Sequence, residues 1–371
     1  MAARKAGGLQ GNAGICMPDM RARDADILVP NFKSKVTGVT ATIVQLTRLH
    51  QKVARVAIVG RCPAHDLPVL TITQLLKSWR RPRIWHARRN GELIAGLFLK
   101  RLFGMNIAVV FTCSNPRPRT GLTRAMLRHV DAIVGTSTAM QDSMPQPLTA
   151  IVPHGIDRTV FRPAGDRAAV RRQLGLPGGF LIGSFGRIRP EKGTDVLVDA
   201  GLGLLREGRD VRFLVVGKVA RGHRSYFQGL QHRIAAAGMR ERFLFREAVP
   251  YETIPLWYQA LDLFVAVPRW EGFGLTVLEA IASGVPVVAS RQGVFASIVA
   301  PGRTGHLVAC DRPGDVREAI AMMVGDLTGT RGAYRDVMRH IPDAYHIETE
   351  ARRLLDLYED LLGRQLSRNR V

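Results

Sequence analysis

The sequence predicts an α/β protein built from two Rossmann-like, doubly wound domains that face each other across a central cleft. The chain has 371 residues, which is enough for two domains of ordinary size. Short apolar runs typical of strands alternate with helical patterns along nearly the whole chain, as they do in parallel sheets. Near the middle, the Pro/Gly-rich stretch IVPHGIDRTVFRPAG interrupts this alternation, which then restarts.

The first half alternates five strand patterns with helical ones, and we expect it to form an N-terminal domain over residues 23–165. Residues 1–22 precede the first strand pattern and read as a disordered tail. The strand patterns are DADILVP (24–30), VARVAIVG (53–60), RIWHAR (83–88), NIAVVFT (106–112) and DAIVGTS (131–137). The helical patterns between them are GVTATIVQLTRLHQ (38–51), LPVLTITQLLKSW (67–79), NGELIAGLFLKRLFG (90–104) and GLTRAMLRHV (121–130).

The second half repeats the alternation, which predicts a C-terminal domain over residues 166–345 joined to the first near residues 155–172. A final helical pattern, within residues 346–371, is expected to pack back toward the N-terminal domain. Strand patterns are FLIGSFG (180–186), VRFLVVG (211–217), RFLFREAV (242–249), LFVAVP (263–268), VPVVAS (285–290) and TGHLVA (304–309). Because ligands of such sheets lie beyond the carboxyl ends of the strands, we expect the binding site in the cleft between the domains.

Composition excludes several classes of protein. The four cysteines form no CxxC pair, so neither a zinc site nor a disulfide framework is expected. The N-terminus has no apolar core of a secretory leader, and the most apolar later stretch, IAGLFLKRLFGMNIAVVF, is interrupted by Lys100 and Arg101. We therefore predict a cytoplasmic protein without a membrane span.

The net charge of +22 is unevenly distributed. Residues 1–150 contain 22 Lys and Arg against 7 Asp and Glu, and KSWRRPRIWHARR (77–89) is the densest cluster. Such a field attracts a polyanion, which can be a nucleic acid, an anionic membrane surface or a phosphorylated acceptor. An ordinary basic protein with solvated arginines is the alternative.

The stretch PRWEGFGLTVLEAIASGVPVVAS (268–290) places Glu271 in a loop after a strand and Glu279 in the helix that follows. The N-terminus of that helix, near Gly274, offers free N–H groups to an anion such as a diphosphate. Carboxylates accept hydrogen bonds from hydroxyl groups and repel phosphate, so the two glutamates suit the sugars of a ligand. Two solvated surface acids are the alternative.

Three further features are candidates for the same site. In GSFGRIRPEKG (183–193), Arg187 and Lys192 follow a strand and are suited to neutralising a diphosphate. In KVTGVTATI (35–43), Gly38 begins the first helix and suits close contact with a phosphate or sugar, or a simple helix cap. His86 ends a strand and should face the cleft, and His154 lies in the linker; a structural, hydrogen-bonded histidine is the alternative for both.

Taken together, EGFGLTVLE, ASGVPVVAS and GRIRPEKG resemble the retaining glycosyltransferases of the GT-B fold that carry two glutamates eight residues apart. The resemblance runs from about Asp26 to the final helix. More narrowly, PNFKSKVTGVTATIVQL, WHARRNGELIAG and VPRWEGFGLTVLEA are similar to the lipopolysaccharide core mannosyltransferases of alphaproteobacteria.

The resemblance implies a role for each matching residue. Arg187 and Lys192 would hold the donor diphosphate, Glu271 the hydroxyls of the donor sugar, and Glu279 the ribose. The remaining donor contacts would come from the backbone near Phe273, Gly274 and Leu275, from Gly38, and at the base from Val249. No metal and no cofactor is implied, because basic side chains and helix ends do that work.

One departure from the family concerns the strand IAVVFTCSNPR. Many members have a histidine after this strand, where this chain has Thr112 and Cys113. His86, Asn115 or Arg117 could replace its contact with the sugar; the alternative is that the narrower subfamily does not use this contact.

The function expected from the resemblance is transfer of mannose from GDP-mannose to an anionic, lipid-linked saccharide of the lipopolysaccharide core. The protein would work in peripheral contact with the inner membrane. A sugar-nucleotide epimerase or phosphorylase of the same fold is one alternative. A basic nucleic-acid-binding protein is another, although the sequence lacks the motifs of specific nucleic-acid binders.

Overall fold

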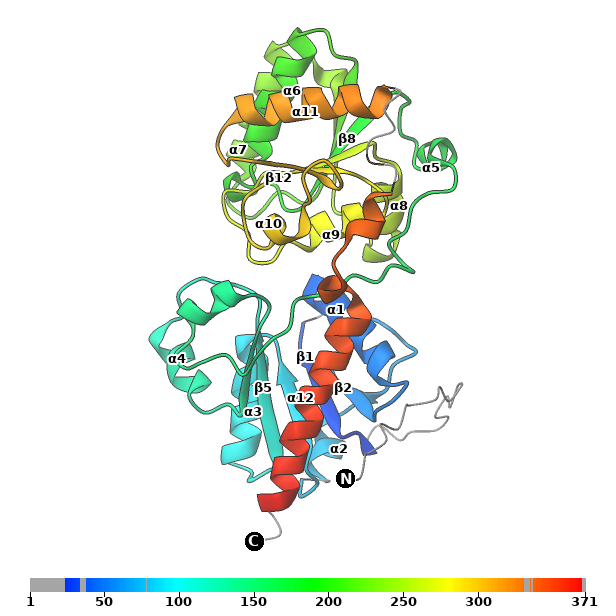
Figure 1. Cartoon of the computed structure of the whole chain (residues 1–371). Helices are drawn as coiled ribbons and strands as arrows, with labels where there is room; N and C mark the ends of the chain where they lie inside the picture. Colours follow the sequence, from blue (N-terminus) through cyan, green and yellow to red (C-terminus); the bar gives the residue numbers. More distant parts are fainter. Residues whose placement is uncertain (1–23, 34–37, 78, 330–333, 335, 369–371) are drawn as a thin grey trace, which may run out of the picture.

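The computed structural model describes residues 24–33, 38–77, 79–329, 334 and 336–368. The tail predicted for residues 1–22 lies outside these residues. Figure 1 shows two lobes joined by two crossings of the chain, with the C-terminal helix lying along the first lobe.

The N-terminal lobe is built on a parallel sheet with the strand order β3-β2-β1-β4-β5-β6-β7. All seven residues of β5 are buried, because helices cover both faces of the sheet, and this explains its continuous apolar sequence. The strands are β1 (Ile27–Asn31), β2 (Val56–Gly60), β3 (Val69–Leu70), β4 (Arg83–Ala87), β5 (Ile107–Cys113), β6 (Ala132–Gly135) and β7 (Ala150–Ile151).

Two helical layers enclose this sheet. Apolar residues of α1 (Gly38–His50) and α12 (Ile347–Arg368) share one core with the sheet. Residues of α2 (Ile72–Leu76), α3 (Asn90–Arg101) and α4 (Gly121–Leu127) share the core on the opposite face.

The C-terminal lobe repeats the plan with the parallel order β10-β9-β8-β11-β12-β13. The strands are β8 (Phe180–Phe185), β9 (Val211–Val216), β10 (Phe243–Arg246), β11 (Leu263–Ala266), β12 (Val287–Ser290) and β13 (Gly305–Val308). One core contains α6 (Thr194–Arg206), α7 (Arg224–Ala236) and α11 (Pro313–Thr328), and the other contains α8 (Ile254–Gln259), α9 (Leu275–Ala282) and α10 (Phe295–Ile298). Two parallel-sheet α/β domains, as predicted, are therefore confirmed.

The connection between the lobes is shorter than the predicted linker near residues 155–172. Helix α5 (Arg167–Gln173) begins inside that range, where the Asp166 side chain caps it by accepting a hydrogen bond from the N–H of Ala169 at 3.0 Å. Arg171 then ties the helix to Asp262 of the C-terminal lobe, with 2.6 Å between nitrogen and oxygen. The Pro/Gly-rich composition did not reveal this short helix.

The two crossings of the chain lie side by side. Ile156 donates its N–H to the carbonyl of Tyr345 at 2.9 Å, and its own carbonyl accepts from Ile347 at 3.3 Å. After this contact, α12 packs on the N-terminal sheet beside α1 (Figure 1). Within the described residues, no helix combines the length and the hydropathy needed to cross a bilayer.

Candidate active site

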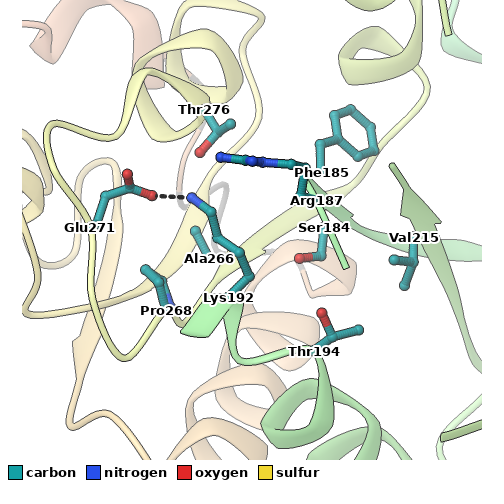
Figure 2. Close-up of a pocket in the computed structure, with 11 residues that line it drawn as sticks. Ser184, Phe185, Arg187, Lys192, Thr194, Val215, Ala266, Pro268, Glu271 and Thr276 are labelled. Atoms are coloured by element: carbon teal, nitrogen blue, oxygen red, sulfur yellow. Dashed lines mark hydrogen bonds and ion pairs between the residues drawn. The ribbon is translucent and has the colours of Figure 1, made fainter. Parts of the chain in front are cut away.

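The order of the C-terminal strands creates a gap at the centre of the sheet. The chain leaves neighbouring strands β8 and β11 toward opposite edges, so the loops after these two strands diverge and leave an opening between them. Arg187 follows β8, and Glu271 follows β11. A pocket lies at this point, lined by Ser184, Phe185, Gly186, Arg187, Lys192, Thr194, Val215, Ala266, Pro268, Glu271 and Thr276 (Figure 2).

Lys192 and Glu271 form an ion pair inside the pocket. The ammonium Nζ lies 2.5 Å from Oε2 of Glu271, and the other carboxylate oxygen accepts the N–H of Gly272 at 3.0 Å. The sequence placed these residues in two loops of one site, and the structure brings them into direct contact.

Gly193 allows Lys192 to lie so close to the β11 loop. Its φ is +69°, and a Cβ at this position would lie 2.0 Å from the carbonyl oxygen of Val267. A side chain would therefore both strain the backbone and push the two loops apart.

Arg269 holds the same two loops together. It bonds both carboxylate oxygens of Asp195, at 2.8 and 2.9 Å, and the carbonyl of Pro190. Its own N–H donates to the carbonyl of Glu191 at 3.0 Å. Sequence reasoning missed this clamp, although Arg269 stands two residues before Glu271, because the partners of an arginine in a loop are not encoded locally.

Arg187 is exposed, and its guanidinium forms no hydrogen bond or ion pair with the described residues. Figure 2 shows Arg187 and Lys192 extending from the loop after β8 toward Glu271 and Thr276 on the other side of the pocket. Two cations thus converge where the pocket is open, as a diphosphate would require.

The N-terminus of α9 forms the opposite wall. Gly274 precedes the helix with φ +98°, and a Cβ there would lie 2.1 Å from the ring of Phe295. No side chain caps the helix, and its first turn contains no acidic residue. Leu275 begins α9, and Thr276 lines the pocket, so a hydroxyl and free N–H groups face any bound anion. Thr276 was also missed, although a threonine in the first turn of a helix was a readable signal.

Phe273 plays a structural part beside this helix. Its side chain is buried, and its ring contacts His154 and Tyr345, with centroids 5.0 and 6.2 Å apart. The side chain therefore packs against the two chain crossings, and only the backbone remains available to a ligand.

Glu279 is buried in α9, with 9% of its surface exposed. Tyr258 of α8 donates a hydrogen bond to its Oε2 at 2.7 Å. Burial raises the pKa of the Glu279 carboxyl to about 7, because the apolar surroundings disfavour its charge. Whether neutral or charged, the Glu279 carboxyl can accept hydrogen bonds from the hydroxyl groups of a ligand. Tyr258, which the sequence did not single out, orients this carboxyl.

The N-terminal lobe touches the site at the loop after β5. A Cβ on Gly272 would lie 2.6 Å from the carbonyl oxygen of Ser114, so the two lobes meet closely next to Glu271. Arg117 stacks its guanidinium on the ring of Trp270 at 4.3 Å. Ser114 also bonds Nε2 of His154 at 2.8 Å, whose Nδ1 lies 2.9 Å from Glu350 of α12.

The prediction that His86 faces the cleft is wrong. His86 has no exposed surface, and both ring nitrogens are occupied, Nδ1 by the hydroxyl of Tyr358 and Nε2 by Oγ1 of Thr112 at 2.6 Å. Burial holds the pKa of its imidazole well below the ordinary value. Because α12 returns to cover β4, the strand end that looked open in the sequence lies in a core, and His86 is the structural histidine of the alternative reading.

The remaining candidates are placed as follows. Gly38 is the first residue of α1, is exposed, and would meet no atom within 4 Å if it carried a Cβ. Val249 lies in the loop after β10, half-buried against the core around Tyr258, and is not among the residues that line the pocket. In the part of the chain that the structure describes, no three His, Cys, Asp or Glu side chains are grouped in a way that suits a metal ion.

Comparison with known proteins gives one family and several full-length similarities. The family described as glycosyl transferases group 1 matches residues 166–328. The lipopolysaccharide core biosynthesis mannosyltransferase LpsB of Rhizobium meliloti (strain 1021) is 38% identical over 92% of this chain and 99% of its own. The enzyme of the same description, LpcC of Rhizobium leguminosarum bv. viciae, is 38% identical over 94% of this chain and 99% of its own.

Among solved structures, HepE of Anabaena in complex with UDP and glucose superimposes with a TM-score of 0.76. The likeness covers 91% of this chain and all of HepE, at 18% sequence identity. At this identity the likeness concerns the arrangement of the two lobes.

Proposed function

The chain belongs to the group 1 glycosyltransferases, and on this premise we propose that it transfers mannose from GDP-mannose to a sugar of the lipopolysaccharide core, retaining the anomeric configuration. The family and its GT-B arrangement of two Rossmann-like domains were expected from the sequence, and both are confirmed. The names of two relatives that match over nearly the full chain support the choice of mannose and of the lipopolysaccharide core.

The observation that carries the proposal is the convergence of Arg187, Lys192 and Glu271 at the gap between β8 and β11. We assign the two cations and the N-terminus of α9 to the donor diphosphate, Glu271 to the mannose hydroxyls, and Glu279 to the ribose. The backbone near Phe273 and Leu275, with Gly38 from the N-terminal lobe, completes the donor contacts in this proposal, and we assign Val249 to the base.

The proposed reaction requires stabilisation of a leaving group more than proton transfer by a side chain. As the bond between mannose and the β-phosphate breaks, negative charge builds on the phosphate oxygens, where the cations and helix N–H groups are already placed. The acceptor hydroxyl attacks on the same face, and its proton passes to the departing phosphate. In this scheme neither a metal nor a cofactor is needed.

The proposed acceptor is an anionic, lipid-linked saccharide held by the basic N-terminal lobe. Residues 1–150 carry three times as many Lys and Arg as Asp and Glu, which suits an acceptor that bears phosphates or carboxylates. The protein would then work in the cytoplasm, peripheral to the inner membrane.

The test is an assay with purified protein, lipopolysaccharide core acceptor and a panel of nucleotide sugars. We expect GDP release and a mannosylated product with GDP-mannose, and much slower turnover with UDP-glucose or ADP-glucose. Donor alone is the control for the alternatives: an isomerised or phosphorolysed sugar without acceptor would replace the proposal by an epimerase or a phosphorylase.

A further inference from the structure

We propose that the outward face of α3 and the loop that follows it dock onto an anionic lipid bilayer. This surface, here called the α3 flank, consists of Trp79, Ile94, Phe98, Leu102 and Phe103 together with the cations Arg80 and Arg101. The inference extends the proposed function, because it assigns the surface that brings the protein to a lipid-linked acceptor.

The apolar residues of α3 fall on two opposite faces. Leu93 and Leu97 are buried in the core under the sheet. Ile94, Phe98 and Leu102 follow one another at intervals of four residues and are 49, 51 and 68% exposed. Because residues four apart lie on one side of a helix, these three form a half-exposed apolar stripe on the side of the helix away from the core.

The stripe continues beyond the helix. The ring of Phe103 packs edge-on against Phe98, with centroids 5.3 Å apart. Trp79 lies beside Gly104, since a Cβ on that glycine would be 3.9 Å from the indole, and Asn106 donates its N–H to the carbonyl of Trp79 at 3.1 Å. Large apolar side chains gathered on one surface mark a site of interaction.

The charge around the flank selects the kind of partner. Residues 67–130 contain twelve Lys and Arg and one acid, Glu92, which is 2% exposed and is bonded to Arg89 and to the N–H of Arg88. Arg80 lies over the ring of Trp79 at 5.0 Å. Five exposed cations in this segment form no ion pair with any acid of the described residues: Lys77, Arg80, Arg101, Arg124 and Arg128.

This combination favours lipid over the other occupants. A second copy of the chain would bring two strongly basic surfaces together, because a twofold interface pairs a patch with itself. Single-stranded nucleic acid would use the aromatic rings for stacking but leaves no role for Ile94 and Leu102. An anionic bilayer meets both features, since its headgroups attract the cations and its interface accepts the apolar side chains.

The flank lies on one side of the N-terminal lobe. Helices α3 and α4 cover one face of the N-terminal sheet, while α1 and α12 cover the other (Figure 1). Helix α3 begins at the carboxyl end of β4, the same edge of the sheet from which the Ser114 loop contacts Gly272 beside the pocket. The helix runs from there toward the opposite edge, so Trp79, Leu102 and Phe103, which precede β4 and β5, lie at the amino ends of these strands. A bilayer against the flank therefore lies along the side of the N-terminal lobe, and the interdomain site opens at the edge where α3 begins.

The test compares flotation of the full-length protein with two kinds of vesicle. Vesicles of phosphatidylethanolamine and phosphatidylglycerol should carry the wild type upward, and vesicles of phosphatidylcholine alone should not. The variant Phe98→Ser/Leu102→Ser should partition about tenfold more weakly into the anionic vesicles, because two large apolar side chains are lost. Arg80→Gln/Arg101→Gln should bind the anionic vesicles more weakly than the wild type does, because two of the cations that attract the headgroups are lost.

The matched control is Val160→Ser/Met322→Ser, which removes two apolar side chains of similar exposure away from the flank. It should float as the wild type does. The proposal is overturned if the wild type stays unbound, if the flank variant floats equally well, or if sedimentation shows a wild-type dimer that the flank variant dissociates. Binding of a single-stranded oligonucleotide that the flank variant abolishes while flotation is retained would also overturn it.

Failure of this inference can be told apart from failure of the proposed function. The shift in melting temperature on adding GDP-mannose needs no membrane, so the flank variant should keep it, which also shows that the variant is folded. Absence of that shift in a wild type that floats on anionic vesicles would remove the proposed donor and leave the docking surface standing.

Discussion

The ammonium of Lys192 lies 2.5 Å from the carboxylate of Glu271, so the proposed donor site is closed by its own ion pair. A nucleotide diphosphate and Glu271 therefore compete for the ammonium group of Lys192. Binding of the donor would exchange the partners: Lys192 turns to the phosphate, and Glu271 is released to accept the hydroxyls of the sugar.

Replacing Glu271 with Gln should separate turnover from nucleotide binding. The amide keeps the size of the side chain but no longer holds Lys192 by charge, so GDP should bind at least as tightly as to the wild type. Turnover should fall on the order of 10²-fold or more, because contacts with the sugar in the transition state are lost. Titration calorimetry with GDP and steady-state kinetics measure the two effects; wild-type turnover would contradict the assignment.

Replacing Lys192 or Arg187 with Gln should weaken stabilisation of the leaving diphosphate. We expect kcat to fall on the order of 10²- to 10³-fold for each, as for other groups placed at developing charge. Arg209→Gln is the matched control, since Arg209 is an exposed arginine of the same lobe outside the pocket. Equal losses in Arg187→Gln and in the control would show that net charge, and not position, matters.

Binding of the donor should depend on the ionisation of Glu279. Burial raises the pKa of this carboxyl to about 7, so in the free protein it is largely protonated at pH 6 and ionised at pH 8. Ribose hydroxyls that donate to the carboxylate favour its charged form, so affinity should rise across this range and binding at pH 6.5 should release protons. Calorimetry in two buffers of different ionisation enthalpy detects the release, and Glu279→Gln should abolish it.

The same raised pKa has a consequence for stability. The folded protein holds a proton on Glu279 that the unfolded chain, with a pKa near 4.5, has already lost. The contribution of this group to the free energy of unfolding is therefore full below about pH 4.5 and disappears as the pH rises through about 7. Thermal unfolding between about pH 4.5 and 7 should show a smaller decline for Glu279→Gln than for the wild type.

His86 should matter for stability and not for catalysis. His86→Ala removes two buried hydrogen bonds and leaves a cavity between β4 and α12, which should cost about 2–4 kcal/mol in the free energy of unfolding. At a temperature where the variant is folded, kcat should stay near the wild-type value. His129→Ala, at an exposed position of the same lobe, is the control. A large loss of kcat in folded His86→Ala would restore the catalytic role.

The buried histidines also set the behaviour in acid. Burial lowers the pKa of His50 to about 4 and that of His86 well below its ordinary value. The unfolded chain takes up protons on both near pH 6.5, and the folded protein does not, so the contribution of the two histidines to the free energy of unfolding should decline as the pH falls from about 6.5 toward 4. Thermal unfolding as a function of pH measures this decline. If a variant that lacks both His50 and His86 no longer shows it, the two histidines are its cause.

Much of the fold could be predicted because its signals are local. The strand IAVVFTC and the helix between Gly274 and Gly284 are each encoded within a few residues. The same is true of the placement of Arg187 and Glu271 after strands. The partners of these groups depend on contacts between distant segments. His86 is buried because Tyr358, 272 residues away in α12, contacts its ring. The partners of Arg269 and Tyr258 likewise come from distant loops and helices that no local sequence pattern connects.

The most direct test of the account is a crystal structure with GDP-mannose or GDP. We expect the diphosphate between Lys192, Arg187 and the N-terminus of α9, the ribose near Glu279, and the ion pair between Lys192 and Glu271 broken. Nucleotide bound elsewhere, with this ion pair intact and the pocket between β8 and β11 empty, would contradict the account.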